Sequence, residues 1–171
     1  MPSILTSDLL HKALMDADEQ GYRLEIIDGL GVWEVMPSKR HIDAEARIEK
    51  SVRADPDSKS GECGCFVYRD LYIRFGEGSL RRPDISIFCA EPQEEDEAVT
   101  LIPKAVVEIV SAGSERKDLE LSPPFYLRFA VQDVIVLDPY TNIVWHHRSG
   151  DVKRFQSPVN ISLECGCLVT V

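Results

Sequence analysis

Three stretches of the sequence are apolar on both faces of an extended chain, and they limit the available folds more than any other feature. They are ISIFCA at 85–90, KAVVEIVS at 104–111 and DVIVLD at 133–138. Because successive side chains of a strand point to opposite sides, such strands need cover on both sides of their sheet. Helices packed on both faces provide that cover. The sequence therefore predicts an α/β fold, a mixed central β-sheet flanked by helices.

Other segments with regular apolar spacing predict the helices and strands around this sheet. Apolar residues at helical spacing predict helices at 5–18 and 38–53, and a third helix that ends at Ala130. Two short extended runs, 22–27 and 30–36, are joined by Asp28-Gly29, which is a strong signal for a β-hairpin. Further strands are expected at 66–75, 142–147 and 163–171.

The length and the net charge of the chain limit its domain organisation, its partners and its location. With 171 residues the chain is expected to form one domain over residues 1–171. Its net charge of −10 gives no general attraction to a phosphate backbone, so a nucleic-acid partner requires a local basic patch or a bound metal ion. No apolar run reaches the ~18 residues of a membrane span, and the first residues lack a signal-peptide pattern. We therefore expect no membrane partner and a cytoplasmic location.

The five cysteines include two CGC motifs, at 63–65 and at 165–167. An odd number of cysteines without a secretory signal favours reduced thiols. Two such motifs have enough thiolates for a zinc ion, but the usual zinc spacing leaves two residues between the cysteines rather than one. Both motifs stand in apolar, strand-like sequence, which favours packed thiols over zinc and leaves zinc as the alternative.

Two acids stand beside these apolar strands. Asp84 precedes ISIFCA, and Glu108 lies in the middle of KAVVEIVS. A glutamate in such a strand is costly unless it is exposed, paired or bound to a cation. On adjacent strands, the two carboxylates would converge and leave positions open for water and phosphate, which suits Mg²⁺. The alternative is that Glu108 faces outward on an edge strand and Asp84 caps a turn.

Four segments in the same order resemble the Uma2 family of restriction endonucleases, a branch of the PD-(D/E)XK nuclease superfamily. They are YRLEIIDGLGVWEVMPSKRH, RRPDISIF, VVEIVSAGSERKDL and VQDVIVLDPYTNIVWHHR. The resemblance implies a nuclease fold and hydrolysis of DNA phosphodiester bonds with Mg²⁺ or Mn²⁺. By the same resemblance, Asp84, Glu108 and the backbone carbonyl of Ile109 bind the metal, and Glu25 lies beside them and completes the site. His41 matches a family histidine near the first helix of the motif. A homodimer is expected by analogy, because two DNA strands must be cut.

The resemblance is incomplete at one catalytic position. The lysine of the (D/E)XK element is Val110 here, and the position where members of the family carry a lysine instead is Ser122. A serine can donate a hydrogen bond but has no positive charge. Lys117 is the candidate replacement if its turn folds back toward Glu108; otherwise it is a solvated turn residue. The alternative function is therefore a catalytically inactive nuclease fold that acts as a binding or assembly module.

Overall fold

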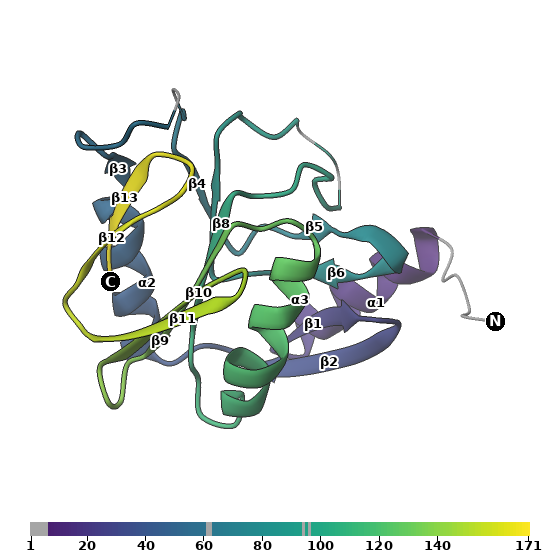
Figure 1. The fold of residues 1–171 in the computed structure, drawn as a ribbon. Helices are drawn as coiled ribbons and strands as arrows, with labels where there is room; N and C mark the ends of the chain where they lie inside the picture. Colours follow the sequence, from purple (N-terminus) through teal and green to yellow (C-terminus); the bar gives the residue numbers. More distant parts are fainter. Residues whose placement is uncertain (1–6, 61–62, 94, 96) are drawn as a thin grey trace.

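The computed structural model describes residues 7–60, 63–93, 95 and 97–171, and its central feature is a mixed β-sheet (Figure 1). Strands β8 and β9 of this sheet run parallel, and its other neighbouring strands are antiparallel. The expected mixed sheet is confirmed. In spatial order its strands are β11 (Asp151–Gln156), β10 (Ile143–Arg148), β9 (Asp133–Asp138), β8 (Ala105–Ile109), β7 (Ile85–Phe88) and β4 (Phe66–Arg69).

Helices cover both faces of the central sheet, as the apolar strands require. Val106 and Val107 are neighbours on β8, point to opposite faces and are both fully buried. Val107 packs in a cluster with residues of α2 (Lys39–Ser51), whereas Val106 packs with residues of α3 (Ser122–Arg128). The prediction of helices on both faces is therefore confirmed.

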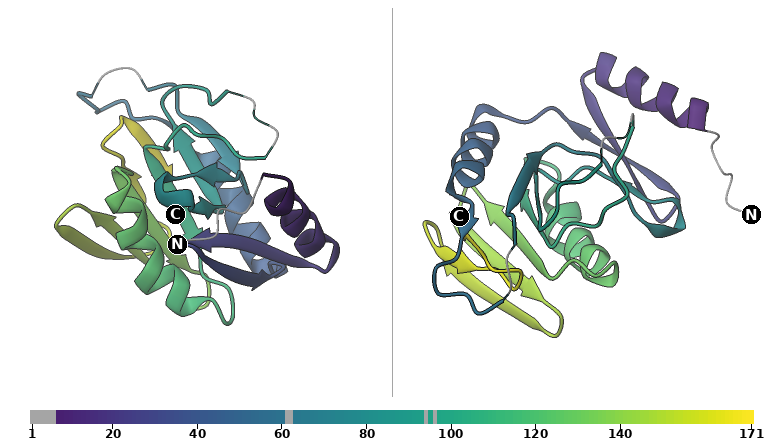
Figure 2. Two further views of the ribbon diagram at one scale, coloured as in Figure 1. Left: turned by 90° about the vertical axis from the view of Figure 1, so that its right-hand side faces the viewer. Right: turned by 90° about the horizontal axis from the view of Figure 1, so that it is seen from above.

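A second sheet carries the N-terminal part of the chain. Its strands are β2 (Leu30–Val35), β1 (Tyr22–Ile27), β6 (Leu80–Arg81) and β5 (Ile73–Arg74), and α1 (Ser7–Glu19) packs on it. The predicted hairpin is present: Asp28 and Gly29 both have positive φ, as a two-residue turn of type I′ requires. Figure 2 shows α1 and this sheet at one end of the molecule and the C-terminal strands at the other.

The C-terminal strands form a small third sheet, in the order β12 (Asn160–Ser162), β13 (Cys167–Thr170) and β3 (Arg53–Ala54). The cysteines gather beside it. Disulfides join Cys63 to Cys89 and Cys65 to Cys167, and Cys165 is a buried free thiol. The expectation of reduced thiols is therefore wrong for four of the five cysteines in this structure. Sequence spacing could not predict the pairing because its partners are far apart in the chain.

The expected strand at 66–75 is divided in two. Asp70 has a positive φ of 52°, and this left-handed conformation ends β4 before β5 begins in the other sheet. In the part of the chain that the structure describes, no helix has both the length and the apolar character needed to cross a membrane.

Candidate active site

The two acids singled out from the sequence lie on neighbouring strands. Strands β7 and β8 are antiparallel with Ile85 opposite Val107, so continuing this register by one residue places Asp84 beside Glu108. Both side chains are buried. Neither the exposed edge position for Glu108 nor a simple turn cap for Asp84 fits this placement. The two acids are therefore neighbours across β7 and β8.

Asp84 is held as a carboxylate by contacts from three elements. Its Oδ1 atom lies 2.9 Å from Nε2 of His41 in α2 and accepts from Arg23 of β1 at 3.1 Å. Its Oδ2 atom accepts from the backbone N–H of Ile109 at 2.7 Å. Burial alone would raise the pKa of Asp84, but the hydrogen bond and charge of His41 and the Ile109 N–H outweigh it and lower this pKa. Asp84 is therefore ionised at neutral pH.

Glu108 is in a different electrostatic environment. Its Oε1 atom accepts from the hydroxyl of Tyr126 at 2.7 Å and from Arg81 at 3.3 Å. Burial, reinforced by the nearby charge of Asp84, raises the pKa of Glu108 well above its usual value. The pKa values of Asp84 and Glu108 are thus shifted in opposite directions, which is a common arrangement in active sites.

Arg81 supplies the positive charge that Ser122 cannot. It is fully buried, and its guanidinium lies over the rings of Phe125 and Tyr126 at 4.9 and 4.6 Å. It donates to Ser122 Oγ at 2.8 Å and, as noted, to Glu108. A positive group therefore lies next to Glu108, at the position where the family carries a lysine. Sequence reasoning noticed arginines before Asp84 but gave Arg81 no role.

Lys117 reaches the same cluster from a π-helical turn, η2 (Lys117–Leu121), which leads directly into α3. Its Nζ atom lies 3.1 Å from Glu25, 2.5 Å from Glu34 and 3.2 Å from Asp118. Burial would lower the pKa of Lys117, but the surrounding carboxylates, Glu25 first, raise it well above its usual value. Lys117 thus folds back toward the site and stays protonated.

Glu25 lies beside the two basic residues. It accepts from Arg81 at 3.2 Å through Oε1, and Lys117 contacts its other oxygen. Burial opposes ionisation of Glu25, but Arg81 and Lys117 together lower its pKa to about 2. The structure therefore brings Glu25, Asp84, Glu108 and Lys117 into one buried network, although Glu25 is bound to cations of the protein itself.

A cavity of about 200 Å³ opens onto this network. Asp84, Ile109 and Lys117 line it, together with His41 and Trp33. The side chain of Trp33 is exposed at the cavity. Glu25 and Glu108 are not among the described residues that line the cavity, so their side chains do not face its open space.

Sequence reasoning missed one further acid. Glu45 lies one helical turn after His41 on the buried face of α2, and its Oε1 atom has no hydrogen-bond partner among the described residues. Burial, with the charges of Asp70 and Asp84, raises the pKa of Glu45 to about 7. The i, i+4 spacing of a histidine and an acid on one helix face was the signal available in the sequence.

The donor atoms suit a hard divalent cation in kind. Carboxylate and carbonyl oxygens are the ligands that Mg²⁺ and Mn²⁺ prefer, and Asp84, Glu108 and the Ile109 carbonyl are of that type. Asp84 and Ile109 border the cavity, where an ion would keep its water ligands. The residues present therefore fit such an ion.

The chain matches the model of a family described as "Uma2: Putative restriction endonuclease" over residues 8–165. It belongs to the Uma2 family. Among solved structures, it is similar to a putative nuclease belonging to DUF820 from Anabaena variabilis, with 21% sequence identity and a TM-score of 0.61. That match covers 81% of this chain and 80% of the other.

No curated protein is similar enough to this Uma2 chain to count as a match. The structural similarity supports the nuclease-like fold that the family resemblance implied, and it agrees with the mixed sheet and helices that the strand pattern predicted. Proteins of the restriction-endonuclease-like class generally use divalent metal ions.

Proposed function

We propose that this Uma2 protein hydrolyses DNA phosphodiester bonds with a divalent ion, Mg²⁺ or Mn²⁺. The observation that carries the proposal is the placement of Asp84 beside Glu108 on β7 and β8, with Arg81 and Lys117 next to them. The family match and the nuclease fold support a phosphodiester substrate. Asp84, Glu108 and the Ile109 carbonyl would hold the ion.

When bound, a divalent ion lowers the pKa of its water and neutralises charge that develops on phosphorus. The two acidic residues proposed as ligands differ in the direction of their pKa shifts. The pKa of Asp84 is lowered, whereas burial raises the pKa of Glu108 and so opposes the ionised form that a metal ligand requires. Metal affinity is therefore expected to rise with pH.

Lys117 and Arg81 have separate tasks in this mechanism. Lys117 lines the cavity as a protonated amine, so it attracts the scissile phosphate and offsets its charge. It does not take a proton from water, because its raised pKa leaves no neutral amine at working pH. Arg81 is buried, and it orients Glu108 from behind rather than touching DNA.

The cavity has features that suit a nucleic acid in spite of the net charge of −10. Its lining has three basic residues, Arg23, His41 and Lys117, which can contact a phosphate but are paired with the acids Glu34, Asp84 and Asp118 of the same lining. The exposed ring of Trp33 offers a surface on which a base can stack. A homodimer, which would present two such cavities to two strands, stays a prediction, as does the extent of the domain over residues 1–171.

The alternative function, an inactive binding or assembly module, is favoured by one observation. The carboxylates of the site are already paired with cations of the protein: Asp84 with Arg23 and His41, and Glu25 with Arg81 and Lys117. A network whose carboxylates are paired without metal can be purely structural. Cleavage and metal binding, measured together, separate the two functions.

The test is cleavage of a supercoiled plasmid with Mg²⁺ or Mn²⁺, together with calorimetric titration of Mn²⁺. We expect Asp84→Ala and Glu108→Ala to reduce cleavage by about 100-fold or more, since the ion contributes several kcal/mol to the reaction. Asp43→Ala removes an exposed acid of α2 and is the matched control. Equal cleavage by all the variants would show that the site is wrongly assigned. Absence of cleavage by the wild type in either metal would favour the inactive module.

A further inference from the structure

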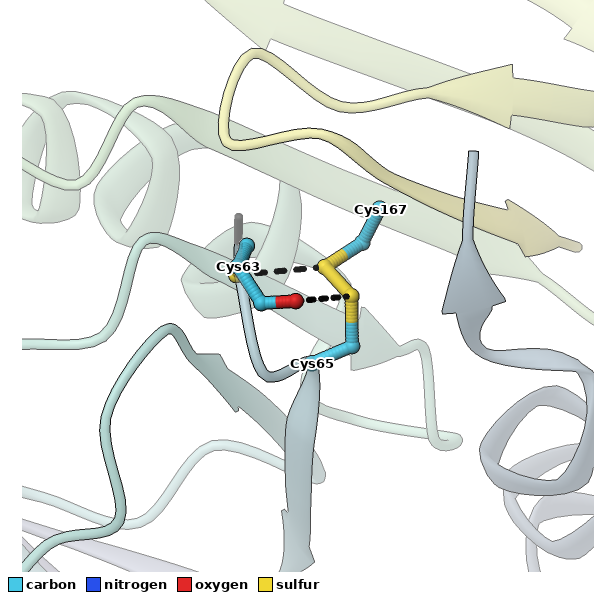
Figure 3. Close-up of side chains that lie close together, drawn as sticks. All are labelled: Cys63, Cys65 and Cys167. Carbon is cyan, nitrogen blue, oxygen red and sulfur yellow. Dashed lines mark hydrogen bonds between the residues drawn. A yellow bond between two sulfur atoms is a disulfide. The ribbon is translucent and has the colours of Figure 1, made fainter. Parts of the chain in front are cut away.

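The five cysteines form one sulfur cluster, although they come from three separate parts of the chain. Cys63 and Cys65 precede β4, Cys89 follows β7, and Cys165 and Cys167 lie at the start of β13. The sulfur atoms of Cys63, Cys65 and Cys167 all lie within 4.8 Å of one another (Figure 3). Those of Cys63, Cys89 and Cys165 do so as well. Cys63 is common to both groups and therefore stands at the centre of the cluster.

The disulfides do not separate these sulfurs into independent pairs. Cys63 is bonded to Cys89, yet its Sγ atom also lies 3.4 Å from Sγ of Cys167, which is bonded to Cys65. Four sulfur atoms thus form a continuous group with Cys165 at its side. Two structural disulfides need no contact with each other, whereas four ligands of one ion must converge on a single point.

The backbone of both CGC motifs is adapted to this convergence. Gly64 donates from its N–H to the carbonyl of Cys89 at 3.1 Å, and a Cβ atom on Gly64 would lie 3.0 Å from that carbonyl oxygen and 2.3 Å from the ring of Phe66. Gly166 has a φ of 94°, which side chains other than hydrogen disfavour. Gly64 thus allows a tight turn that brings the sulfurs of Cys63 and Cys65 within 4.8 Å of each other, and Gly166 allows the turn that leads into β13 at Cys167.

We propose that the reduced sulfur cluster binds one zinc ion through Cys63, Cys65, Cys89 and Cys167. A Zn–S bond of about 2.3 Å in tetrahedral geometry places sulfurs about 3.8 Å apart. Sγ of Cys63 and Sγ of Cys167 lie 3.4 Å apart, and the Cys89 sulfur must move toward those of Cys65 and Cys167 once the two disulfides are reduced. A thiol reductant first reduces the two disulfides to four thiols and is itself oxidised to its disulfide. Each of the four thiols then releases its proton, and four S–Zn bonds form without further change of oxidation state. Thiolates select zinc over Mg²⁺ or Mn²⁺, so the ion differs from that of the nuclease site.

Four thiolate ligands leave no open position, which makes this site structural rather than catalytic. It would join the segment before β4, the end of β7 and the start of β13, and so attach the C-terminal sheet to the central sheet. Cys165 is buried beside the four ligands and is the fifth, unused thiol. The zinc site is independent of the proposed nuclease activity.

The first experiment uses the wild-type protein, purified with a reductant and without chelator. We expect one zinc per chain by elemental mass spectrometry. After denaturation with EDTA, all five thiols should react with Ellman's reagent, and the intact mass should be that of the fully reduced chain. A metal-free protein with one reactive thiol, four hydrogen masses lighter, would overturn the proposal in favour of two disulfides.

The second experiment identifies the ligands. Co²⁺ titrated into the metal-free, reduced wild type should give sulfur-to-cobalt charge-transfer bands and the visible bands of a tetrahedral site. Cys165→Ser should keep both spectra and zinc content, whereas Cys63→Ser and Cys65→Ser should lose them. If Cys63→Ser and Cys65→Ser fail to fold, the comparison of the wild type with Cys165→Ser still tests whether Cys165 is one of the ligands. Loss of zinc in Cys165→Ser would overturn the ligand assignment.

Discussion

The two ends of strand β7 carry opposite kinds of chemistry. Asp84 precedes the strand in a network of charged side chains, and Cys89 follows it in a cluster of sulfur atoms. The five residue steps between them span roughly 16 Å at about 3.3 Å per residue. One short buried strand therefore positions a charged site at its start and a sulfur site at its end.

Burial has different consequences for the carboxylates at the start of β7 and for the thiols at its end. A buried carboxylate must be paired, so Asp84 and Glu25 collect partners from β1, β6, α2 and η2. A buried thiol is tolerated without any partner, so the cysteines are free to form disulfides, bind a metal or simply pack. Charge thus fixes the contacts of the first site, whereas the oxidation state of the protein and its metal supply decide those of the second.

The largest expected effect in this comparison comes from removing the buried cation of the charged end. Arg81→Met leaves Glu25 and Glu108 without their shared guanidinium, and we expect it to lower the free energy of unfolding by about 3–5 kcal/mol. Urea denaturation measures this change. Arg116→Met, which removes an exposed arginine, is the control and should change stability by less than ~0.5 kcal/mol. Similar values for both variants would show that the charge network does not hold this end together.

Lys117→Met tests the charge that faces the cavity. If Lys117 offsets the charge of the scissile phosphate, its removal should slow plasmid cleavage by about 100-fold at saturating metal. Lys117→Arg keeps the charge and should recover part of the rate. Lys153→Met removes an exposed lysine of β11 and should leave the rate unchanged. An unchanged rate in Lys117→Met would assign this lysine a structural role only.

Glu45→Gln tests the uncompensated acid through pH. The pKa of Glu45 is about 7 in the folded protein and near its ordinary value of 4.5 when unfolded, so the folded state binds this proton more tightly. Wild-type stability should therefore fall as the pH rises from about 4.5 to about 7. Glutamine imitates the protonated form, so Glu45→Gln should melt a few degrees above the wild type at pH 8 and close to it at pH 4.5.

The control for this measurement is Asp43→Asn, which changes an exposed acid on the same helix. It should follow the wild type at both pH values. If Glu45→Gln melts below the wild type at pH 8, then Glu45 is ionised in a favourable interaction, and its place in the electrostatics of the site must be revised.

The smallest expected effect is the coupling between the two ends. Because they lie roughly 16 Å apart and share no side-chain partner, Lys117→Met and Cys89→Ser should change the free energy of unfolding additively, within about 0.5 kcal/mol. A double-mutant cycle by urea denaturation of the reduced protein measures this coupling. A coupling above 1 kcal/mol would mean that β7 transmits strain between the two sites.

The local sequence pattern was sufficient to predict the two strands that carry Asp84 and Glu108. The apolar runs around Asp84 and Glu108 predicted strands, and their adjacency followed from the order of elements. The pattern missed Arg81 as the partner of Glu108, because this contact is not local in sequence. It also missed Glu45, although the i, i+4 spacing from His41 was a local signal. It also extended β4 through Asp70, whose left-handed conformation has no clear signal in a strand that otherwise alternates.

The sequence by itself determined the fold class, because strands that are apolar on both faces can be buried in few other ways. It also determined the chemical character of each site, since carboxylates favour hard cations and thiolates favour soft ones. Only the tertiary structure decided the partners: Arg81 beside Ser122 in place of a lysine, and the two CGC motifs beside Cys89. Periodicity encodes the burial of a residue, whereas contacts between distant segments arise only when the strands have packed.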